Sequence, residues 1–258
     1  MKFRKLKLGL QTLLTDKPKG YFIPYRYADG DIPAAKRGHY SGIERLFLKK
    51  KPDFIKILDG FNHSKEIFNS LNETPPTNPR WQQDWFPGLD GAAAFEIIKN
   101  EMPRHIIEIG SGHSTRFMNH AIETSNLKTK ITSIDPAPRA DISQLSHVHL
   151  FKTIVQNIDR NIFNKLKTGD ILFIDSSHIL MPGNDVDLLF NHIIPALPAG
   201  VIIHIHDMAL PDDYPEHWQW RGYNEQLGVI PMLASGGFDP HSAGRFPAPV
   251  QNSHHPAQ

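Results

Sequence analysis

Four polar side chains that can carry chemistry stand where two strongly apolar segments end. Asp175 and His178 follow the first segment, and His206 and Asp207 close the second. An unperturbed imidazole has a pKa of about 6.5 and can accept a hydroxyl proton near neutral pH, while a carboxylate held at the end of a strand needs a partner. We therefore predict that Asp175, His178, His206 and Asp207 form a catalytic group, with His178 as the general base.

Three of these residues, Asp175, His206 and Asp207, also suit a metal site. Carboxylate oxygens and a neutral imidazole bind divalent cations, and a cation such as Mg²⁺ lowers the pKa of a bound hydroxyl group. A histidine is an uncommon ligand for so hard an ion, and a buried histidine that hydrogen-bonds to backbone carbonyls gives the same pattern. The sequence leaves Mg²⁺ or another divalent cation open at this place.

A glycine-rich turn after another apolar segment predicts a nucleotide-cofactor loop. Residues 105–109 run into Gly-Ser-Gly at 110–112 and then into a predicted helix. Glycines let the backbone bend sharply and approach a ligand, and the N–H groups of the helix start attract a carboxylate or a phosphate. A dinucleotide-binding loop has a third glycine where this chain has Thr115, so the pattern disfavours NAD and favours S-adenosylmethionine.

A second acidic strand end supports a cofactor site. Asp135 closes the β-branched segment 131–135, about two dozen residues beyond the glycine loop. In a βαβ unit such a carboxylate reaches ribose hydroxyls. The glycine loop alone is as readily an ordinary strand-to-helix turn, but the loop together with Asp135 favours a cofactor site.

Strands and helices that position these groups alternate along the chain. Apolar runs predict strands over 105–109, 131–135, 148–152, 170–175 and 201–206. Helical spacing predicts helices over 45–61, 89–100, 114–125, 185–197 and 223–234. This alternation is typical of an α/β fold with a doubly wound, mostly parallel sheet.

Three regions are expected along the chain. Residues 1–85 are expected to form an N-terminal prefix or helical cap packed on the core, and residues 86–237 a Rossmann-like domain. Residues 238–258 are dense in proline and small polar residues, which predicts a disordered tail.

Composition bounds the class of protein. The chain has 258 residues, of which 40% are hydrophobic, and a formal charge of +1, which indicates a soluble globular protein and argues against a nucleic-acid binder. Without cysteine, disulfides, thiolate catalysis and cysteine-ligated metals are excluded. Gln11 interrupts the basic, leucine-rich amino terminus, and no segment is apolar for long enough to span a bilayer. We therefore expect a cytoplasmic protein with no membrane partner.

Four motifs together resemble those of a bacterial class I S-adenosylmethionine-dependent methyltransferase. They are IIEIGSGHSTRFM, ITSIDPAPR, DILFIDSSHILMPGNDVDLLF and GVIIHIHDMALPDDYP, and the resemblance covers about residues 20–235. It implies a cofactor that lies over the first strands, with a methyl acceptor beneath the methyl group. On this basis the expected cofactor-binding residues are Glu108, Gly110, Ser111, Gly112, His113 and Asp135, with adenine contacts near Gln156 and Asn157.

The resemblance also implies the reaction. We expect an O-methyltransferase that binds S-adenosylmethionine and methylates a hydroxyl group of a small molecule or sugar, with metal assistance left open. The family has two further strands where this chain has its proline-rich end, so we expect an incomplete C-terminal edge of the sheet. A NAD-dependent oxidoreductase, a metal-dependent hydrolase that uses His204, His206 and Asp207, and a non-catalytic methyltransferase remnant stay open, as does a homo-oligomer.

Overall fold

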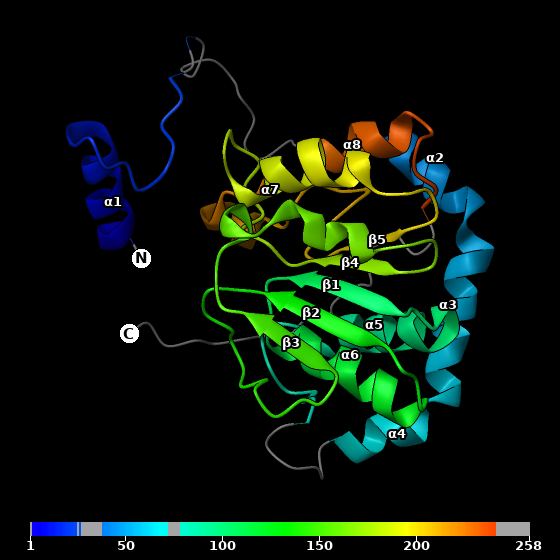
Figure 1. The fold of residues 1–258 in the computed structure, drawn as a ribbon. Coiled ribbons are helices and arrows are strands. Elements are labelled where there is room, and N and C mark those ends of the chain that lie inside the picture. Colours follow the sequence, from blue (N-terminus) through cyan, green and yellow to red (C-terminus); the bar gives the residue numbers. More distant parts are fainter. Residues whose placement is uncertain (1, 25, 27–37, 72–77, 241–258) are drawn as a thin grey trace. The chain divides into compact units, whose positions relative to one another are not determined.

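Two compact units make up the chain, residues 1–38 and residues 39–258. The computed structural model describes residues 2–24, 26, 38–71 and 78–240 (Figure 1). The first unit contains α1 (Lys2–Leu14), whose Phe3, Leu6 and Leu10 side chains are exposed. Within the described residues no helix is long and apolar enough to cross a membrane. The boundary between these units lies after residue 38, and the expected division at residue 85 stays a prediction.

A five-stranded parallel sheet forms the centre of the second unit. Its strands are β1 (His105–Ile109), β2 (Lys130–Ile134), β3 (Val148–Phe151), β4 (Ile171–Ile174) and β5 (Ile202–Ile205). They lie in the order β3-β2-β1-β4-β5 (Figure 1). All five predicted strands are present, and the prediction of a doubly wound α/β fold is confirmed.

The register of the sheet brings the ends of the strands together. Ile109 of β1 lies opposite Ile134 of β2 and Ile174 of β4, and Ile174 lies opposite Ile205 of β5. The next residue of each strand therefore stands at the same edge of the sheet. In open parallel sheets this carboxyl edge is where ligands bind.

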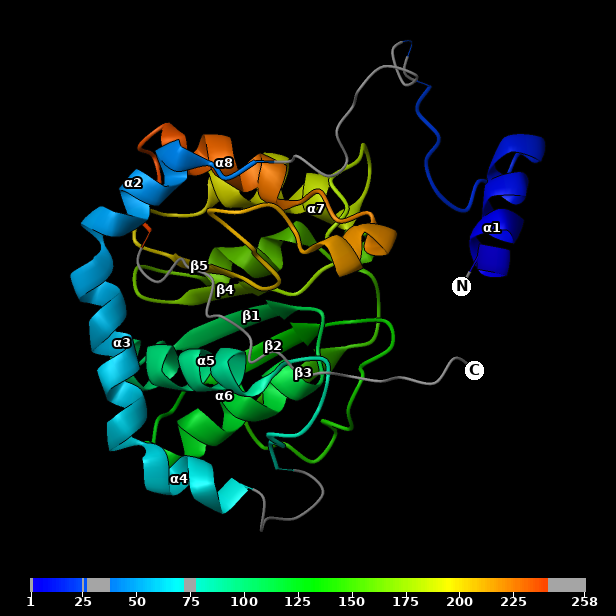
Figure 2. The same ribbon diagram turned by 180° about the vertical axis from the view of Figure 1, so that it is seen from behind.

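One face of the sheet is covered by α5 (Gly88–Glu101) and α6 (His113–Thr124), and α4 (Lys65–Ser70) packs on α5 through Phe68 and Phe95. Figure 2 shows α5 and α6 in front of the strands. Their large side chains, Phe95 and Phe117, are buried with Ile106 of β1 and Phe173 of β4. Burial of each such side chain contributes about 1.5–3 kcal/mol, so this packing fixes α6 directly behind the glycine loop.

The other face is covered by α2 (Ser41–Lys49), α7 (Asp185–Leu188) and α8 (Gln226–Ala234), which pack on the opposite side chains of the same strands. α3 (Lys51–His63) runs from α2 to α4 and packs against α5. Short 3₁₀ turns lie at Val155–Asn157, Arg160–Lys165 and Glu216–Arg221. The sheet therefore has helices on both faces, as expected for a doubly wound fold.

Two predicted helices are interrupted. The helix expected over 45–61 is two helices that meet at Lys50, where Pro52 stands in the first turn of α3. The helix expected over 185–197 begins as α7 and continues as a π-helix (Leu189–Ile193) and a 3₁₀ turn (Ile194–Ala196). Pro195 cannot donate a backbone hydrogen bond, so the regular α-helical pattern cannot run through it.

β5 is an edge strand of the sheet in the described part of the chain. Phe238 still packs against the core, while the predicted disordered tail lies outside the described residues from residue 241 on. The expectation of an incomplete edge therefore stays a prediction.

Candidate functional site

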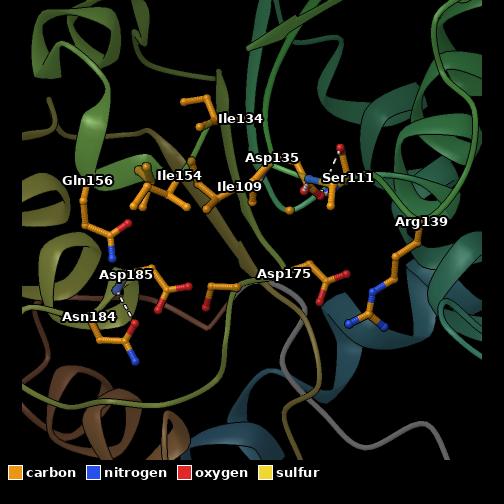
Figure 3. Close-up of a pocket in the computed structure, with 15 residues that line it drawn as sticks. Ile109, Ser111, Ile134, Asp135, Arg139, Ile154, Gln156, Asp175, Asn184 and Asp185 are labelled. Carbon is orange, nitrogen blue, oxygen red and sulfur yellow. Dashed lines mark hydrogen bonds between the residues drawn. The ribbon is translucent and has the colours of Figure 1, made fainter. Parts of the chain in front are cut away.

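A cavity of about 390 Å³ opens at the carboxyl ends of β1, β2 and β4. Its size falls in the range of roughly 300–1,000 Å³ that is typical of small-molecule sites. Figure 3 shows the residues around it. They are Ile109, Gly110, Ser111, Ile134, Asp135, Pro136, Ala137, Arg139, Ile154, Val155, Gln156, Asp175, Ser176, Asn184 and Asp185.

The turn after β1 requires glycine at residue 110. Gly110 has a φ of 79°, and a Cβ atom there would lie 1.9 Å from the carbonyl oxygen of Asp175. Thr115, which stands where a dinucleotide loop has its third glycine, has a specific role: its Oγ1 accepts a hydrogen bond of 2.9 Å from the N–H of Gly112. Thr115 therefore caps the turn into α6.

Asp135 holds the glycine loop against the turn after β2. Its Oδ2 accepts hydrogen bonds from the N–H of Ser111 at 2.6 Å and from Ser111 Oγ at 3.2 Å, and its Oδ1 accepts one from the N–H of Ala137 at 2.6 Å. A carboxylate has about four acceptor positions, so Asp135 can still accept a hydrogen bond from a ligand in the cavity. Asp135 thus shapes the cavity and lines it.

Glu108 occupies a different place from the one expected. It is fully buried and does not line the cavity, and its carboxylate accepts hydrogen bonds from Ser114 at 2.7 Å, Thr115 at 2.8 Å and Ser133 at 2.5 Å. Burial raises its pKa to about 7, although the three hydroxyl groups oppose this shift. The direct cofactor contact predicted for Glu108 is therefore replaced by a supporting role behind the glycine loop.

The other predicted cofactor residues divide into two groups. Gly110, Ser111 and Gln156 line the cavity, whereas Gly112 and His113 do not. His113 Nδ1 is buried without a hydrogen-bond partner among the described residues, and burial lowers the pKa of this imidazole. The sequence therefore identified the loop, but not which of its side chains face the cavity.

All four predicted catalytic residues lie together beside the cavity. Asp175 Oδ1 is 3.3 Å from His178 Nε2 and 3.3 Å from His206 Nδ1. Asp207 lies across from them, with one carboxylate oxygen 3.6 Å from His178 Nε2 and the other 3.6 Å from His206 Nδ1. Because Asp175 also lines the cavity, this catalytic cluster (Asp175, His178, His206 and Asp207) adjoins it directly.

Two further carboxylates contact the imidazoles of the cluster, and the sequence analysis did not identify them. Glu225 Oε2 is 2.8 Å from His178 Nδ1, and Asp90 Oδ2 is 3.3 Å from His206 Nε2. Each imidazole thus has carboxylates at both ring nitrogens. Asp90 in α5 and Glu225 at the start of α8 carry no local motif, so only the tertiary fold reveals them.

These partners set the charges of the cluster. Burial opposes a charge on His178, but hydrogen bonds with Asp175 and Glu225 outweigh it and raise the pKa of His178 to about 9. Burial likewise opposes a charge on His206, yet Asp175 and Asp90 raise its pKa well above the ordinary value. Despite burial, the two imidazoles hold the pKa of the Asp175 carboxyl far below its usual range.

The general-base role predicted for His178 does not fit these charges. That prediction used an unperturbed imidazole, which is largely neutral at neutral pH. With a pKa of about 9, His178 keeps its proton there and can only donate hydrogen bonds. Asp175, which lies between the two imidazoles, is the carboxylate of the cluster that also lines the cavity, and we take it as the proton acceptor.

His204 stands apart from the cluster. Its ring packs on Phe173, with ring centroids 4.5 Å apart, and burial lowers its pKa to about 4. His204 is therefore a neutral packing residue.

The same geometry bears on the predicted metal site. Both ring nitrogens of His206 face carboxylates, Nδ1 toward Asp175 and Nε2 toward Asp90. Neither nitrogen therefore points to a position where a cation could also be bound by the two aspartates. Among the residues that the structure describes, no group of three or more His, Asp or Glu side chains is arranged to hold a metal. The donors as placed do not fit a cation.

Part of the chain matches a known family model. Residues 107–208 match the family model described as "Methyltransferase domain". A solved structure titled "cmcI-N160 SAH" is 16% identical, with 66% of this chain and 79% of that chain covered and a TM-score of 0.36, a likeness too distant to add to the argument. No curated protein matches the chain.

The matched segment begins within β1 and ends just after β5. It therefore contains nearly the whole sheet, every residue that lines the cavity and the four residues of the catalytic cluster. Residues 107–208 are thus similar to a methyltransferase domain, as the four motifs led us to expect, and they lie on a doubly wound parallel sheet.

Proposed function

We propose that this protein transfers a methyl group from S-adenosylmethionine to a hydroxyl group of a small molecule or sugar. The observation that carries the proposal is the position of Asp175, whose carboxylate belongs both to the cavity and to the catalytic cluster. This arrangement suits methyl transfer, because the methyl group and the acceptor oxygen must meet in line at one point.

The donor set of the cavity suits this cofactor. Ile109, Ile134 and Ile154 offer an apolar surface for adenine, and Asp135 offers a carboxylate for ribose hydroxyls. Asp175 and Asp185 offer negative charge toward a sulfonium and an α-amino group. When bound, S-adenosylmethionine would supply a methyl group that is already activated by the positive sulfur.

The catalytic cluster would then handle the acceptor. His178 and His206 keep Asp175 ionised, and Asp175 accepts a hydrogen bond from the acceptor hydroxyl. Asp175 would then accept the hydroxyl proton, which becomes strongly acidic once the acceptor oxygen is being alkylated. A weak base suffices for this step, because the proton leaves an oxygen that is already being alkylated.

Calorimetry with S-adenosylhomocysteine tests the cofactor directly, with NAD as the negative control. We expect a dissociation constant on the order of 1–100 µM for the wild-type protein and none measurable for NAD. Asp135→Asn should weaken binding about tenfold or more, because a charged acceptor of several hydrogen bonds is lost. The matched control is Asp159→Asn, since Asp159 is exposed and does not line the cavity.

The acceptor is found in a second step. Candidate hydroxyl compounds are incubated with protein and S-adenosylmethionine, and products heavier by one methylene unit are sought by mass spectrometry, with and without Mg²⁺. A Mg²⁺-dependent rate would revive the predicted metal role of Asp175, His206 and Asp207. A folded wild-type protein that binds neither S-adenosylmethionine nor S-adenosylhomocysteine would refute the proposal and favour the remnant.

A further inference from the structure

Three consecutive residues, Asn224, Glu225 and Gln226, contact the loops after both β4 and β5. Asn224 holds the loop after β4: its Oδ1 accepts a hydrogen bond of 2.6 Å from the N–H of Leu180, and its Nδ2 donates one of 3.2 Å to the carbonyl of Leu180. The N–H groups of Asn224 and Glu225 donate to the carbonyl of His178 at 3.0 and 3.2 Å. This loop is therefore tied to the start of α8.

The middle residue reaches the imidazole itself. Glu225 is fully buried; its Oε2 lies 2.8 Å from His178 Nδ1, and its Oε1 accepts a hydrogen bond of 3.3 Å from Ser176 Oγ. With Nδ1 held in this way, the other ring nitrogen, Nε2, faces Asp175 at 3.3 Å and Asp207 at 3.6 Å. A carboxylate that orients one nitrogen of a histidine fixes the direction of the other.

The third residue holds the loop after β5. Gln226 is fully buried, and its Oε1 accepts a hydrogen bond of 3.2 Å from the N–H of Ala209. Its Nε2 donates to the carbonyl of Asp212 and to the Asp213 carboxylate, both at 3.2 Å. The loop that begins with His206 and Asp207 is thus tied to the same tripeptide as the loop after β4.

We propose that Asn224-Glu225-Gln226 is a positioning element that sets the separation of Asp175 and Asp207, with Glu225 acting through the His178 ring. The proposal rests on the methyl-transfer function proposed above. It adds to that function a group that does not touch the cofactor cavity, since none of the three residues lines it.

Backbone geometry supports positioning rather than stability as the role. His178 and Asp207 have φ angles of 60° and 56°, in the left-handed region that few residues other than glycine adopt. Such conformations persist only where the surroundings hold them, and they cluster at functional sites. A buried ion pair such as His178–Glu225 adds little stability compared with apolar residues of the same size, so its specific contribution is the orientation of the ring.

The test separates ring orientation from folding. Glu225→Gln keeps the shape of the side chain and removes its charge, Glu225→Ala removes the contact, and Glu216→Gln is the matched control, because Glu216 is exposed. A ring N–H proton held by a buried carboxylate gives a proton NMR signal far downfield of the amides. His178→Gln assigns that signal, and S-adenosylhomocysteine affinity and the methyl-transfer rate are measured on each variant.

Both Glu225 variants should lose or shift the downfield signal and bind S-adenosylhomocysteine within about twofold of wild type. Their turnover should fall about tenfold to a hundredfold, the cost expected when reacting groups are displaced by an ångström. A retained signal with full turnover would overturn the proposal. So would a parallel loss of melting temperature, affinity and turnover, which would mean a general structural role.

The two proposals fail in different ways. If wild-type protein binds no S-adenosylhomocysteine, the proposed function fails, whereas the NMR signal still reports whether Glu225 orients His178. If wild-type protein binds and methylates normally and Glu225→Ala does so too, only the positioning role fails.

Discussion

Replacing Glu108 by glutamine should change how the stability of the protein depends on pH. Glu108 is fully buried behind the glycine loop, and burial raises its pKa from 4.5 to about 7. The folded protein therefore binds this proton more tightly than the unfolded chain does. Such a group contributes its stability below pH 4.5 and loses it as the pH rises through about 7.

The size of the effect follows from the shift. Each pKa unit corresponds to 1.36 kcal/mol, so the shift from 4.5 to about 7 costs the wild-type protein about 3 kcal/mol of unfolding free energy once Glu108 is ionised. Glu108→Gln cannot ionise and retains an acceptor for the hydroxyl groups of Ser114, Thr115 and Ser133. Relative to wild type, the variant should therefore gain stability as the pH rises from 5 to 8.

Urea denaturation at a series of pH values between 5 and 8 measures this difference. Other titrating groups contribute equally to both proteins, so they cancel in the comparison. Glu123→Gln is the control, because Glu123 is exposed near the end of α6, and its difference from wild type should stay flat. Parallel curves for wild type and Glu108→Gln across the whole range would refute the raised pKa and the buried supporting role derived from it.

Three further changes have defined outcomes. Gly110→Ala should cost about 3 kcal/mol or more of unfolding free energy and abolish S-adenosylhomocysteine binding in calorimetry, because its Cβ would lie 1.9 Å from the Asp175 carbonyl oxygen at a φ of 79°. The raised pKa of His178 stabilises the folded protein only while the ring is charged, so the unfolding free energy of wild type in urea should fall as the pH rises from 6.5 through about 9. In His178→Gln this pH-dependent fall should be absent. Arg139→Met should weaken the binding of S-adenosylhomocysteine but not of 5′-methylthioadenosine, which lacks the carboxylate. Arg139 is the basic residue that lines the cavity, and its guanidinium lies 3.8 Å from the centre of the Trp85 ring. Equal losses of affinity for both ligands would exclude a contact between Arg139 and the carboxylate.

Local patterns in the sequence were enough to predict the sheet and its carboxyl edge. Each strand is a short apolar run with a polar residue at its end, and in a parallel sheet these ends meet at one edge. The sequence alone therefore assigns Asp135, Asp175 and His206 to one edge of the sheet, where the strand register puts them. The parallel direction of the strands is sufficient to predict this common edge.

The supporting carboxylates could not be predicted in this way. His206 and Asp90 are separated by 116 residues, and His178 and Glu225 by 47 residues, so no window of sequence contains both members of either pair. The role of Glu108 could have been read: it alternates with Ile107 and Ile109 in a buried strand, which directs it toward α6 and away from the strand end. The resemblance to the family motif instead suggested that Glu108 binds the cofactor.

Charge was the second limit of the sequence. An imidazole next to a strand end suggested a base, but each of the two buried rings is flanked by carboxylates that keep it protonated. Proton affinity depends on which groups face the ring across the fold, and those groups come from α5, the loop after β5 and the start of α8. Sequence can therefore nominate the members of such a cluster but not their protonation states.

The close approach of Gly110 to Asp175 joins the two halves of the proposed reaction. The turn that would receive the cofactor lies directly against the backbone of the residue that would receive the acceptor proton, and no side chain fits between them. Movement of β4 along the sheet would consequently change the cavity and the catalytic cluster together. The tripeptide at the start of α8 acts only on the second of these, because its contacts reach the loops beyond Asp175 and His206 and leave the glycine loop untouched. Substitutions there are therefore expected to separate turnover from cofactor affinity, whereas substitutions at Gly110 are expected to abolish both.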